Sequence, residues 1–174
     1  MKSIGTEKII FISVGVTTLI FIILVTVFAS RDSTNSANSD TKLVTYSASE
    51  TDKPKTVTSS NFSDLGDMKL NSEKSATFTI TNQGNKPLQL YDIKSSCMCT
   101  FGQITIDGVK SPEFGMHSEN PWIGIVAPGK KATLSVIYKP YLMPVSGTIS
   151  RDVYVKTNDP SSSNLTFTVK AFVE

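Results

Sequence analysis

Cysteine and histidine are scarce in this sequence. Its 174 residues include two cysteines and one histidine, which leaves little room for a catalytic constellation. There is no Gly-rich phosphate loop, no Gly-x-Ser-x-Gly nucleophile turn and no His-Glu-x-x-His zinc motif. A Ser–His–Asp triad would have to use His117, and no serine motif supports one. We therefore expect a protein that is not an enzyme.

An excess of charge of one sign is also missing. The chain has 17 Lys and Arg against 15 Asp and Glu, a net charge of +2. Binding to nucleic acid needs basic side chains clustered on one face, and no block of like charge occurs along the chain. We therefore expect no nucleic-acid partner.

One long hydrophobic run stands near the N-terminus. No charged residue interrupts the segment from Ile9 to Ala29, IIFISVGVTTLIFIILVTVFA. As a helix it would be about 31 Å long, close to the thickness of the hydrocarbon core of a bilayer. Lys2 and Lys8 precede it, which favours a cytoplasmic N-terminus. We predict a single-pass transmembrane helix within residues 1–30, an anchor to the cell membrane that leaves the rest of the chain outside the cytoplasm.

A cleaved signal peptide is the alternative for this segment. Val27 and Ala29 fit the small-residue positions of a cleavage site, and cleavage there would give a secreted protein. The apolar run is longer than the 7 to 15 residues usual in a signal peptide, so we favour the uncleaved signal-anchor. Both interpretations place the domain outside the cytoplasm.

Residues 31–60 are rich in Ser, Thr, Asn, Asp and Lys. Their one apolar cluster consists of Leu43, Val44 and Tyr46, too little to offset the entropy of ordering the chain. We predict a flexible, disordered linker here and a folded domain over residues 61–174.

The folded part shows the two-residue periodicity of strands separated by turn residues. Alternation over Ser75–Thr81 places Ala76, Phe78 and Ile80 on one face. No stretch after residue 60 has helical periodicity over three turns. We predict an all-β, immunoglobulin-like β-sandwich of about seven strands, which are Ser75–Thr81, Leu88–Lys94, Cys99–Ile106, Trp122–Val126, Ala132–Tyr138, Thr148–Lys156 and Leu165–Val173.

Several local signals refine this prediction. Asp107-Gly108 is typical of a tight hairpin turn, and Ala127-Pro128-Gly129 closes another strand. Leu88 and Leu90 share one face of their strand whereas Tyr91 and Ile93 lie on the other, which predicts a bulge or burial on both sides. Pro140, Pro144 and Gly147 bracket a loop that either binds a partner or only turns the chain.

Five short motifs occur one after another along the folded part of the chain. They are Thr81-Asn82-Gln83-Gly84-Asn85-Lys86-Pro87-Leu88, Ser96-Cys97-Met98-Cys99-Thr100, Ala127 to Ala132, a Tyr-Lys-Pro strand end, and Thr157 to Pro160. Over residues 62–173 the chain resembles the DUF1573 domain, a bacterial immunoglobulin-like family of unknown function related to ASH/PapD-like modules. The resemblance implies the fold and no activity. Met98 departs from the glycine that this family usually has between the two cysteines.

The Cys-Met-Cys segment is the sharpest chemical feature. In a strand, Cys97 and Cys99 point to the same side, and the loop with Met116 and His117 follows. Thiolate, thioether and imidazole suit copper(I), and Cys with His suits zinc. One hypothesis is therefore an extracytoplasmic copper- or zinc-binding site built from Cys97, Cys99 and His117, with Met116 or Met98 as a further ligand.

Other interpretations of the two cysteines stay open. They are a disulfide, favoured by an oxidising compartment, a pair of buried thiols, and a redox-active dithiol. The spacing is not the Cys-x-x-Cys of thioredoxin-like enzymes. Trp122 is expected to be a core aromatic between the sheets. For the whole protein we expect a non-enzymatic binding or scaffolding module with a protein partner, with metal binding or thiol redox chemistry as alternatives.

Overall fold

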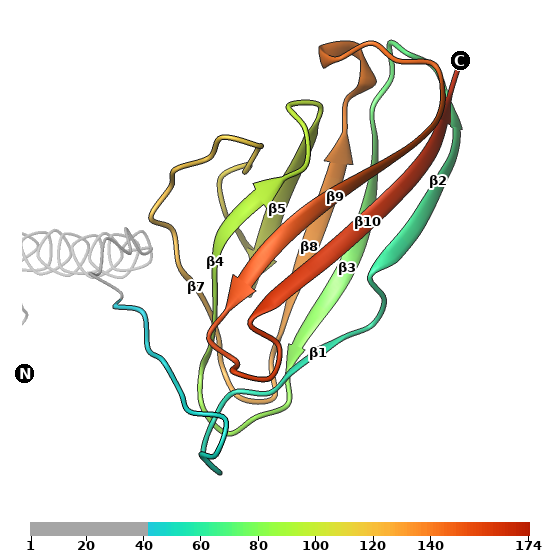
Figure 1. Ribbon diagram of the computed structural model, residues 1–174. Helices are drawn as coiled ribbons and strands as arrows, with labels where there is room; N and C mark the ends of the chain where they lie inside the picture. Colours follow the sequence, from blue (N-terminus) through green and yellow to red (C-terminus); the bar gives the residue numbers. More distant parts are fainter. Residues whose placement is uncertain (1–41) are drawn as a thin grey trace, which may run out of the picture. The chain divides into compact units, whose positions relative to one another are not determined.

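The computed structural model describes residues 42–174, which form a sandwich of two five-stranded sheets (Figure 1). The strands are β1 (Thr56–Thr58), β2 (Phe62–Met68), β3 (Lys74–Asn82), β4 (Leu88–Ser95), β5 (Thr100–Ile106), β6 (Val109–Lys110), β7 (Gly124–Val126), β8 (Lys131–Tyr138), β9 (Gly147–Thr157) and β10 (Asn164–Val173). One short 3-10 helix, η1 (Pro140–Leu142), lies between β8 and β9. The predicted all-β sandwich is confirmed.

The predicted membrane anchor over residues 1–30 lies outside the described residues, as does the first part of the predicted linker. Between residues 42 and 174, no helix is both long enough and apolar enough to cross a membrane.

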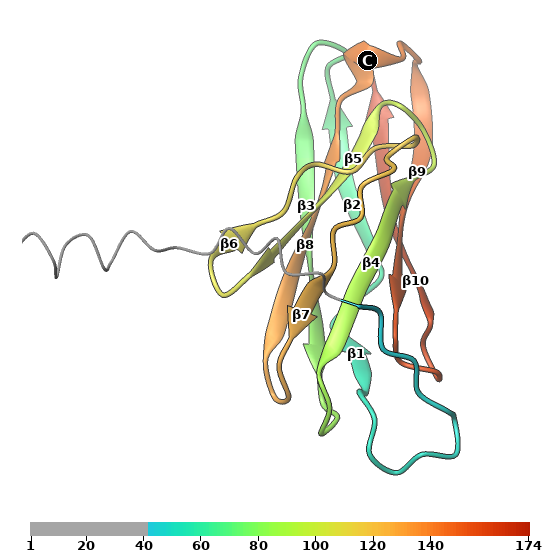
Figure 2. The ribbon, with the colours of Figure 1, turned by 90° about the vertical axis from the view of Figure 1, so that its left-hand side faces the viewer.

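The two sheets have the strand orders β1-β3-β8-β5-β6 and β2-β10-β9-β4-β7 (Figure 2). Neighbouring strands pair antiparallel except β2, which runs parallel to β10 with Phe62 opposite Thr168. Each of the seven strands predicted from alternation coincides with one of these strands. The alternating apolar faces of the central strands are therefore what the two sheets bury against each other.

The main core fills the space between the sheets. Ala76, Phe78 and Ile80 of β3 point inward as predicted, and the rings of Phe78 and Phe167 lie 5.1 Å apart. Fully burying a Leu, Ile, Val or Phe side chain contributes roughly 1.5 to 3 kcal/mol. The main core thus fixes the arrangement of the two sheets.

A second, smaller core lies at the end of the sandwich where β2, β4, β8 and β10 finish. We call this the upper end, because it is at the top of Figure 1. Three turns meet there, the β2–β3 turn, the β4–β5 turn and the β8–β9 loop. The buried residues of this core are Met68, Cys97, Cys99, Tyr138, Ile149, Ala171 and Val173.

The folded chain begins earlier than the predicted boundary at residue 60. Thr56–Thr58 pairs with the edge of β3, and Pro54 is buried. Further upstream, the backbone N–H of Val44 donates to Oε1 of Gln89 at 2.7 Å. The prediction of a linker through residue 60 was wrong for this part because it counted apolar burial alone, whereas backbone hydrogen bonds hold the segment.

Two predicted local features are confirmed. Asp107 and Gly108 both have positive φ, 48° and 84°, as a type I′ hairpin turn requires between β5 and β6. The pairing of β4 with β9 shifts register between Tyr91 and Lys94, where Asp92 has φ 45°. This shift is the bulge predicted from the change of apolar face along β4.

Candidate functional site

The Thr-Asn-x-Gly-Asn motif forms a turn, and its buried residue Asn82 has no polar atom free to bind a ligand. Asn82 is fully buried; its Nδ2 donates to the carbonyls of Lys86 and Val126, and its Oδ1 accepts the N–H groups of Gly84 and Lys55. Every polar atom of this side chain is therefore paired within the protein. The motif holds the β3–β4 turn against the chain entering β1.

The Thr-Asn-Asp-Pro motif has the same kind of role at the β9–β10 turn. Asn158 accepts the backbone N–H of Gln89 at 2.8 Å, and Asp159 accepts the N–H of Thr56 at 2.7 Å and that of Ser161 at 2.9 Å. Both side chains are buried. The motif therefore joins β1, β4 and the β9–β10 turn, and we assign it a structural role.

Cys97 and Cys99 are joined by a disulfide in the turn between β4 and β5. Cys99 is fully buried and Cys97 is 8% exposed, whereas Met98 between them is 53% exposed. Both cysteines belong to the second core. The turn therefore presents Met98 to solvent, buries Cys99 completely and leaves Cys97 slightly exposed.

Several polar groups surround this disulfide. Nε of Arg151 donates to Sγ of Cys99 at 3.4 Å, and Oγ1 of Thr100 lies 3.3 Å from Sγ of Cys97. The backbone N–H of Cys99 also donates to Sγ of Cys97 at 3.2 Å. Burial raises the pKa of Tyr138, and the positive charge of Arg151 opposes this by a smaller amount. The sulfur pair therefore lies among hydrogen-bond donors although it belongs to an apolar core.

The hypothesis of a copper or zinc site needs Cys97, Cys99, His117 and Met116 to converge. The disulfide occupies both sulfur atoms, while His117 and Met116 are exposed on the loop after Phe114. Within residues 42–174 no group of three or more His, Cys, Asp or Glu residues is placed to hold a metal ion. The metal site stays a prediction, and it concerns the reduced protein.

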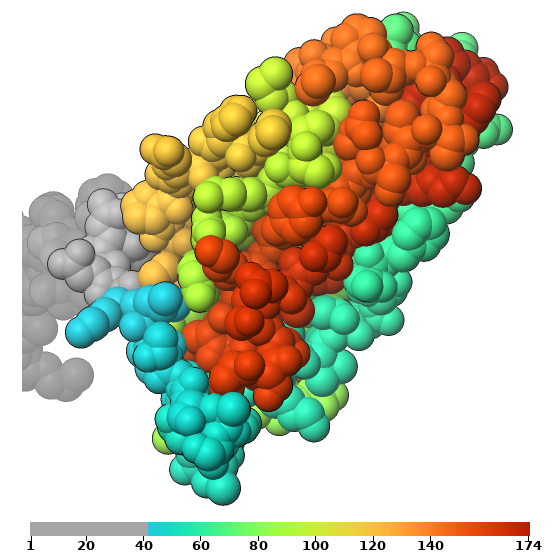
Figure 3. Space-filling model, in the orientation of Figure 1, coloured from blue at the N-terminus to red at the C-terminus, as the bar shows by residue number. Residues whose placement is uncertain are grey.

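The upper end also carries an exposed apolar surface, formed by residues of the β8–β9 loop and the β2–β3 turn. Figure 3 shows the β8–β9 loop, in orange, at this end of the molecule. Tyr141, Leu142 and Met143 are consecutive and are 46%, 47% and 39% exposed. Leu70 from the β2–β3 turn and Pro144 complete this surface, which we call the loop surface. Pro140, buried at the start of η1, fixes the point where the chain leaves β8.

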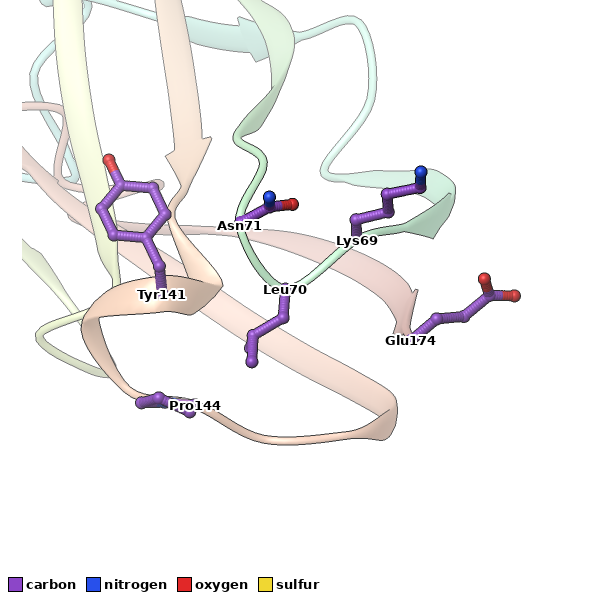
Figure 4. Close-up of a pocket in the computed structure, with 6 residues that line it drawn as sticks. All are labelled: Lys69, Leu70, Asn71, Tyr141, Pro144 and Glu174. Atoms are coloured by element: carbon purple, nitrogen blue, oxygen red, sulfur yellow. The ribbon is translucent and has the colours of Figure 1, made fainter.

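A pocket of about 510 Å³ opens within the loop surface. Figure 4 shows Tyr141 and Pro144 on one side of it, Lys69 and Glu174 on the other, and Leu70 between them. The pocket therefore combines an apolar centre with one positive and one negative side chain at its rim. The sequence marked this loop by its prolines and Gly147 but did not show that Leu70 would join it.

Trp122 is half-buried and packs against the main core, whereas a fully buried position between the sheets was expected. Its ring is 5.6 Å from that of Phe114, and a Cβ on Gly124 would overlap with the indole. The glycine therefore makes room for the tryptophan to cover the edge of β7. We assign Trp122 to packing.

Comparison with known proteins supports the fold. A family profile described as HYDIN/CFA65/VesB-like, Ig-like domain matches residues 54–172. The match begins before residue 60, in agreement with the position of β1. It shows an Ig-like domain, whereas the more specific resemblance to DUF1573 stays a prediction. No curated protein matches the sequence.

Solved structures with a similar fold have low sequence identity. A protein of unknown function from Porphyromonas gingivalis W83 is 20% identical, with a TM-score of 0.53 over 72% of this chain and 50% of that one. The ASH/PapD-like domain 7 of human CEP192 is 11% identical, with a TM-score of 0.48 over 78% and 96%. The YadV chaperone is 13% identical, with a TM-score of 0.43 over 68% and 52%. The chain spans half the length of the Porphyromonas protein.

Proposed function

Because the chain belongs to the HYDIN/CFA65/VesB-like family of Ig-like domains, we propose that it is a non-enzymatic binding module anchored to the cell membrane. Its domain would hold a protein partner outside the cytoplasm. The contact would be made by the loop surface of Leu70, Tyr141, Leu142, Met143 and Pro144.

The exposure of three consecutive apolar side chains carries this proposal. Tyr141, Leu142 and Met143 are each 39% to 47% exposed, and none of them belongs to either buried core. A contiguous exposed apolar patch commonly marks a protein interface, whereas single exposed apolar residues do not. The neighbouring pocket offers a partner a place for an apolar anchor residue, as interface hot spots require.

The chemistry of the pocket favours a protein segment as the ligand. Leu70 and Pro144 would pack against one inserted apolar side chain, while Lys69 and Glu174 lie at the rim. A peptide brings both an apolar side chain and polar backbone groups that can meet these two charges. An interface with an apolar centre and a polar rim is typical of protein–protein contacts.

Two observations support the location outside the cytoplasm. The run from Ile9 to Ala29 is uncharged and long enough to span a membrane. The domain contains a disulfide between Cys97 and Cys99, and disulfides persist mainly in oxidising compartments.

Photo-crosslinking in living cells tests the contact. A photoreactive amino acid at Leu142 should give one discrete crosslinked product with a second protein. The same amino acid at Val109, which is 68% exposed on β6, is the matched control and should give none. Equal products at both positions, or none at position 142, would count against the loop surface.

A fractionation experiment tests the anchor separately. The full chain should stay in the membrane pellet after alkaline carbonate washing, and protease added outside the cytoplasmic membrane should digest the domain. Release into the wash would favour the cleaved or peripheral form. Protection of the domain until the membrane is dissolved would contradict the orientation.

A further inference from the structure

We infer that the Cys97–Cys99 pair is a redox-active dithiol and disulfide that exchanges electrons with a protein dithiol. The inference rests on the polar surroundings of the two sulfurs and does not depend on the binding partner proposed above. It adds a stoichiometric thiol–disulfide exchange to the non-enzymatic binding module proposed above.

The first observation is that three donors face the sulfurs, namely the Arg151 guanidinium, the Thr100 hydroxyl and the backbone N–H of Cys99. A disulfide sulfur is only a weak acceptor and gains little from them. A thiolate is a strong acceptor, and charge-assisted hydrogen bonds are about twice as strong as neutral ones. The surroundings therefore stabilise the reduced, charged form more than the oxidised form.

The second observation is the short span of the crosslink. Cys97 and Cys99 are two residues apart, and the entropic stabilisation from a disulfide grows with the length of the loop that it closes. A crosslink within one turn adds little to the stability of the sandwich. The second core also holds the turn through other buried residues, such as Met68 and Val173.

The difference in exposure determines which sulfur is attacked. Cys97 is 8% exposed and Cys99 is fully buried, under a turn whose tip is the exposed Met98. A thiolate of the donor dithiol attacks Sγ of Cys97 and forms a mixed disulfide. The electron pair of the broken S–S bond goes to Sγ of Cys99, which leaves as a thiolate facing Arg151 Nε. A stabilised leaving thiolate leaves faster.

The second step completes the exchange. The other thiol of the donor, once it has lost its proton, attacks the donor sulfur of the mixed disulfide and releases Cys97 as a thiolate. Thr100 and the N–H of Cys99 then stabilise this thiolate. Two electrons pass from the donor to the Cys97–Cys99 pair, the donor becomes a disulfide, and its two protons go to solvent or to the new thiols.

Substituting Arg151 tests the leaving-group role. The full chain, purified in mild detergent, is reduced with dithiothreitol and equilibrated in glutathione buffers, and its thiols are counted by maleimide gel shift. We expect Arg151→Met to slow reduction about tenfold and to shift the equilibrium about tenfold toward the disulfide. Arg151→Lys keeps the positive charge, so its rate of reduction and its equilibrium should lie between those of wild type and Arg151→Met.

Lys139→Met is the matched control. The backbone N–H of Lys139 donates to the carbonyl oxygen of Cys99, but its ammonium group lies over Phe101 and pairs with Glu113. The variant therefore removes a positive charge near the same turn without removing a contact to sulfur. Identical rates and equilibria in wild type, Arg151→Met and Lys139→Met would overturn the inference. So would a native wild-type disulfide that dithiothreitol reduces only after unfolding.

Single-cysteine variants test the order of attack. Cys97 in Cys99→Ser should form a mixed disulfide with oxidised glutathione at least tenfold faster than Cys99 in Cys97→Ser. Near-UV circular dichroism checks that both variants are folded. Equal rates in two folded variants, or faster reaction of Cys99, would overturn the assignment of Cys97 as the attacked sulfur. If one variant does not fold, mass spectrometry of the mixed disulfide trapped on wild type makes the same distinction.

Discussion

The side chain of Asn158 directs the side chain of Gln89 toward the segment that precedes β1. Oδ1 of Asn158 accepts the backbone N–H of Gln89 at 2.8 Å, and its Nδ2 lies 3.4 Å from Oε1 of Gln89. Gln89 in turn accepts the N–H of Val44 and donates to the carbonyl of Lys42. A residue of the β9–β10 turn thus helps to hold chain that lies far upstream in the sequence.

Replacing Asn158 with Ala should lower the free energy of unfolding by about 2 kcal/mol, because the buried backbone N–H of Gln89 loses its acceptor. Urea unfolding measures the change. The exposed Asn164, whose side chain donates a hydrogen bond to Oγ of Ser163 at 3.2 Å, provides the control, and Asn164→Ala should change stability by less than about 0.5 kcal/mol. Equal losses in the two variants would argue against the network.

Replacing Gly84 with Ala should displace the chain around Lys53 and Pro54. A Cβ at this position would overlap with backbone atoms of Lys53, Pro54 and Lys55, which cannot turn aside as a side chain would. We expect a loss of about 1 to 3 kcal/mol and faster hydrogen exchange over residues 42–58. In Gly129→Ala the added Cβ has open space around it, so the only penalty comes from the positive φ of 74° at this position. Hydrogen exchange over residues 42–58 should therefore not change.

Truncating Phe114 should expose Trp122. Phe114 is 2% exposed and its ring contacts that of Trp122, so Phe114→Ala should cost about 3 to 5 kcal/mol. Trp122 is the only tryptophan in the chain, and its emission in the folded variant should move to longer wavelength. Unchanged emission would mean that Phe114 does not shield the indole.

The bulge in β4 makes stability depend on pH. Hydrogen bonds from Lys156 and Lys94 hold the pKa of Asp92 below its ordinary value of 3.8. A carboxyl group with a lowered pKa stabilises the folded state fully above the unfolded value, and this contribution disappears as pH falls through the lowered pKa. Both lysines are about half exposed, so the effect should be only about 0.5 kcal/mol.

Asp92→Asn isolates this charge, because asparagine tolerates the φ of 45° at the bulge. Wild type should be the more stable protein at pH 6, and the difference should shrink as pH falls below the unfolded value of 3.8 and disappear once pH is below the lowered pKa of Asp92. Urea unfolding at each pH measures it. A difference that stays constant with pH would show that the carboxylate charge contributes nothing.

Strands with one buried apolar face could be predicted from the sequence, whereas strands without such a face could not. β3, β8 and β10 alternate apolar and polar residues over their whole length, and their inward residues are buried. β2 reads FSDLGDM, in which only Leu65 and Met68 pack inward. β1 and β6 are short edge strands held by backbone pairing, which leaves almost no periodic signal.

The candidate sites were predictable only in part. The two cysteines were recognisable as a candidate disulfide, since their spacing is local, and the structure joins them. The approach of Arg151 to Cys99 depends on the pairing of β9 with its neighbours, and the approach of Leu70 to Pro144 depends on the meeting of two distant turns. Such contacts across the sandwich leave no periodic pattern in the sequence.

The parallel pairing of β2 with β10 has a consequence for how the domain is made. Phe62–Met68 finds its only sheet neighbour, among the described residues, in the last strand of the sandwich. β2 is therefore synthesised well before its partner, and its pairing edge stays unpaired until Asn164–Val173 has also been made. Pairing across so much intervening chain is slow, so we expect β2 to join its sheet last.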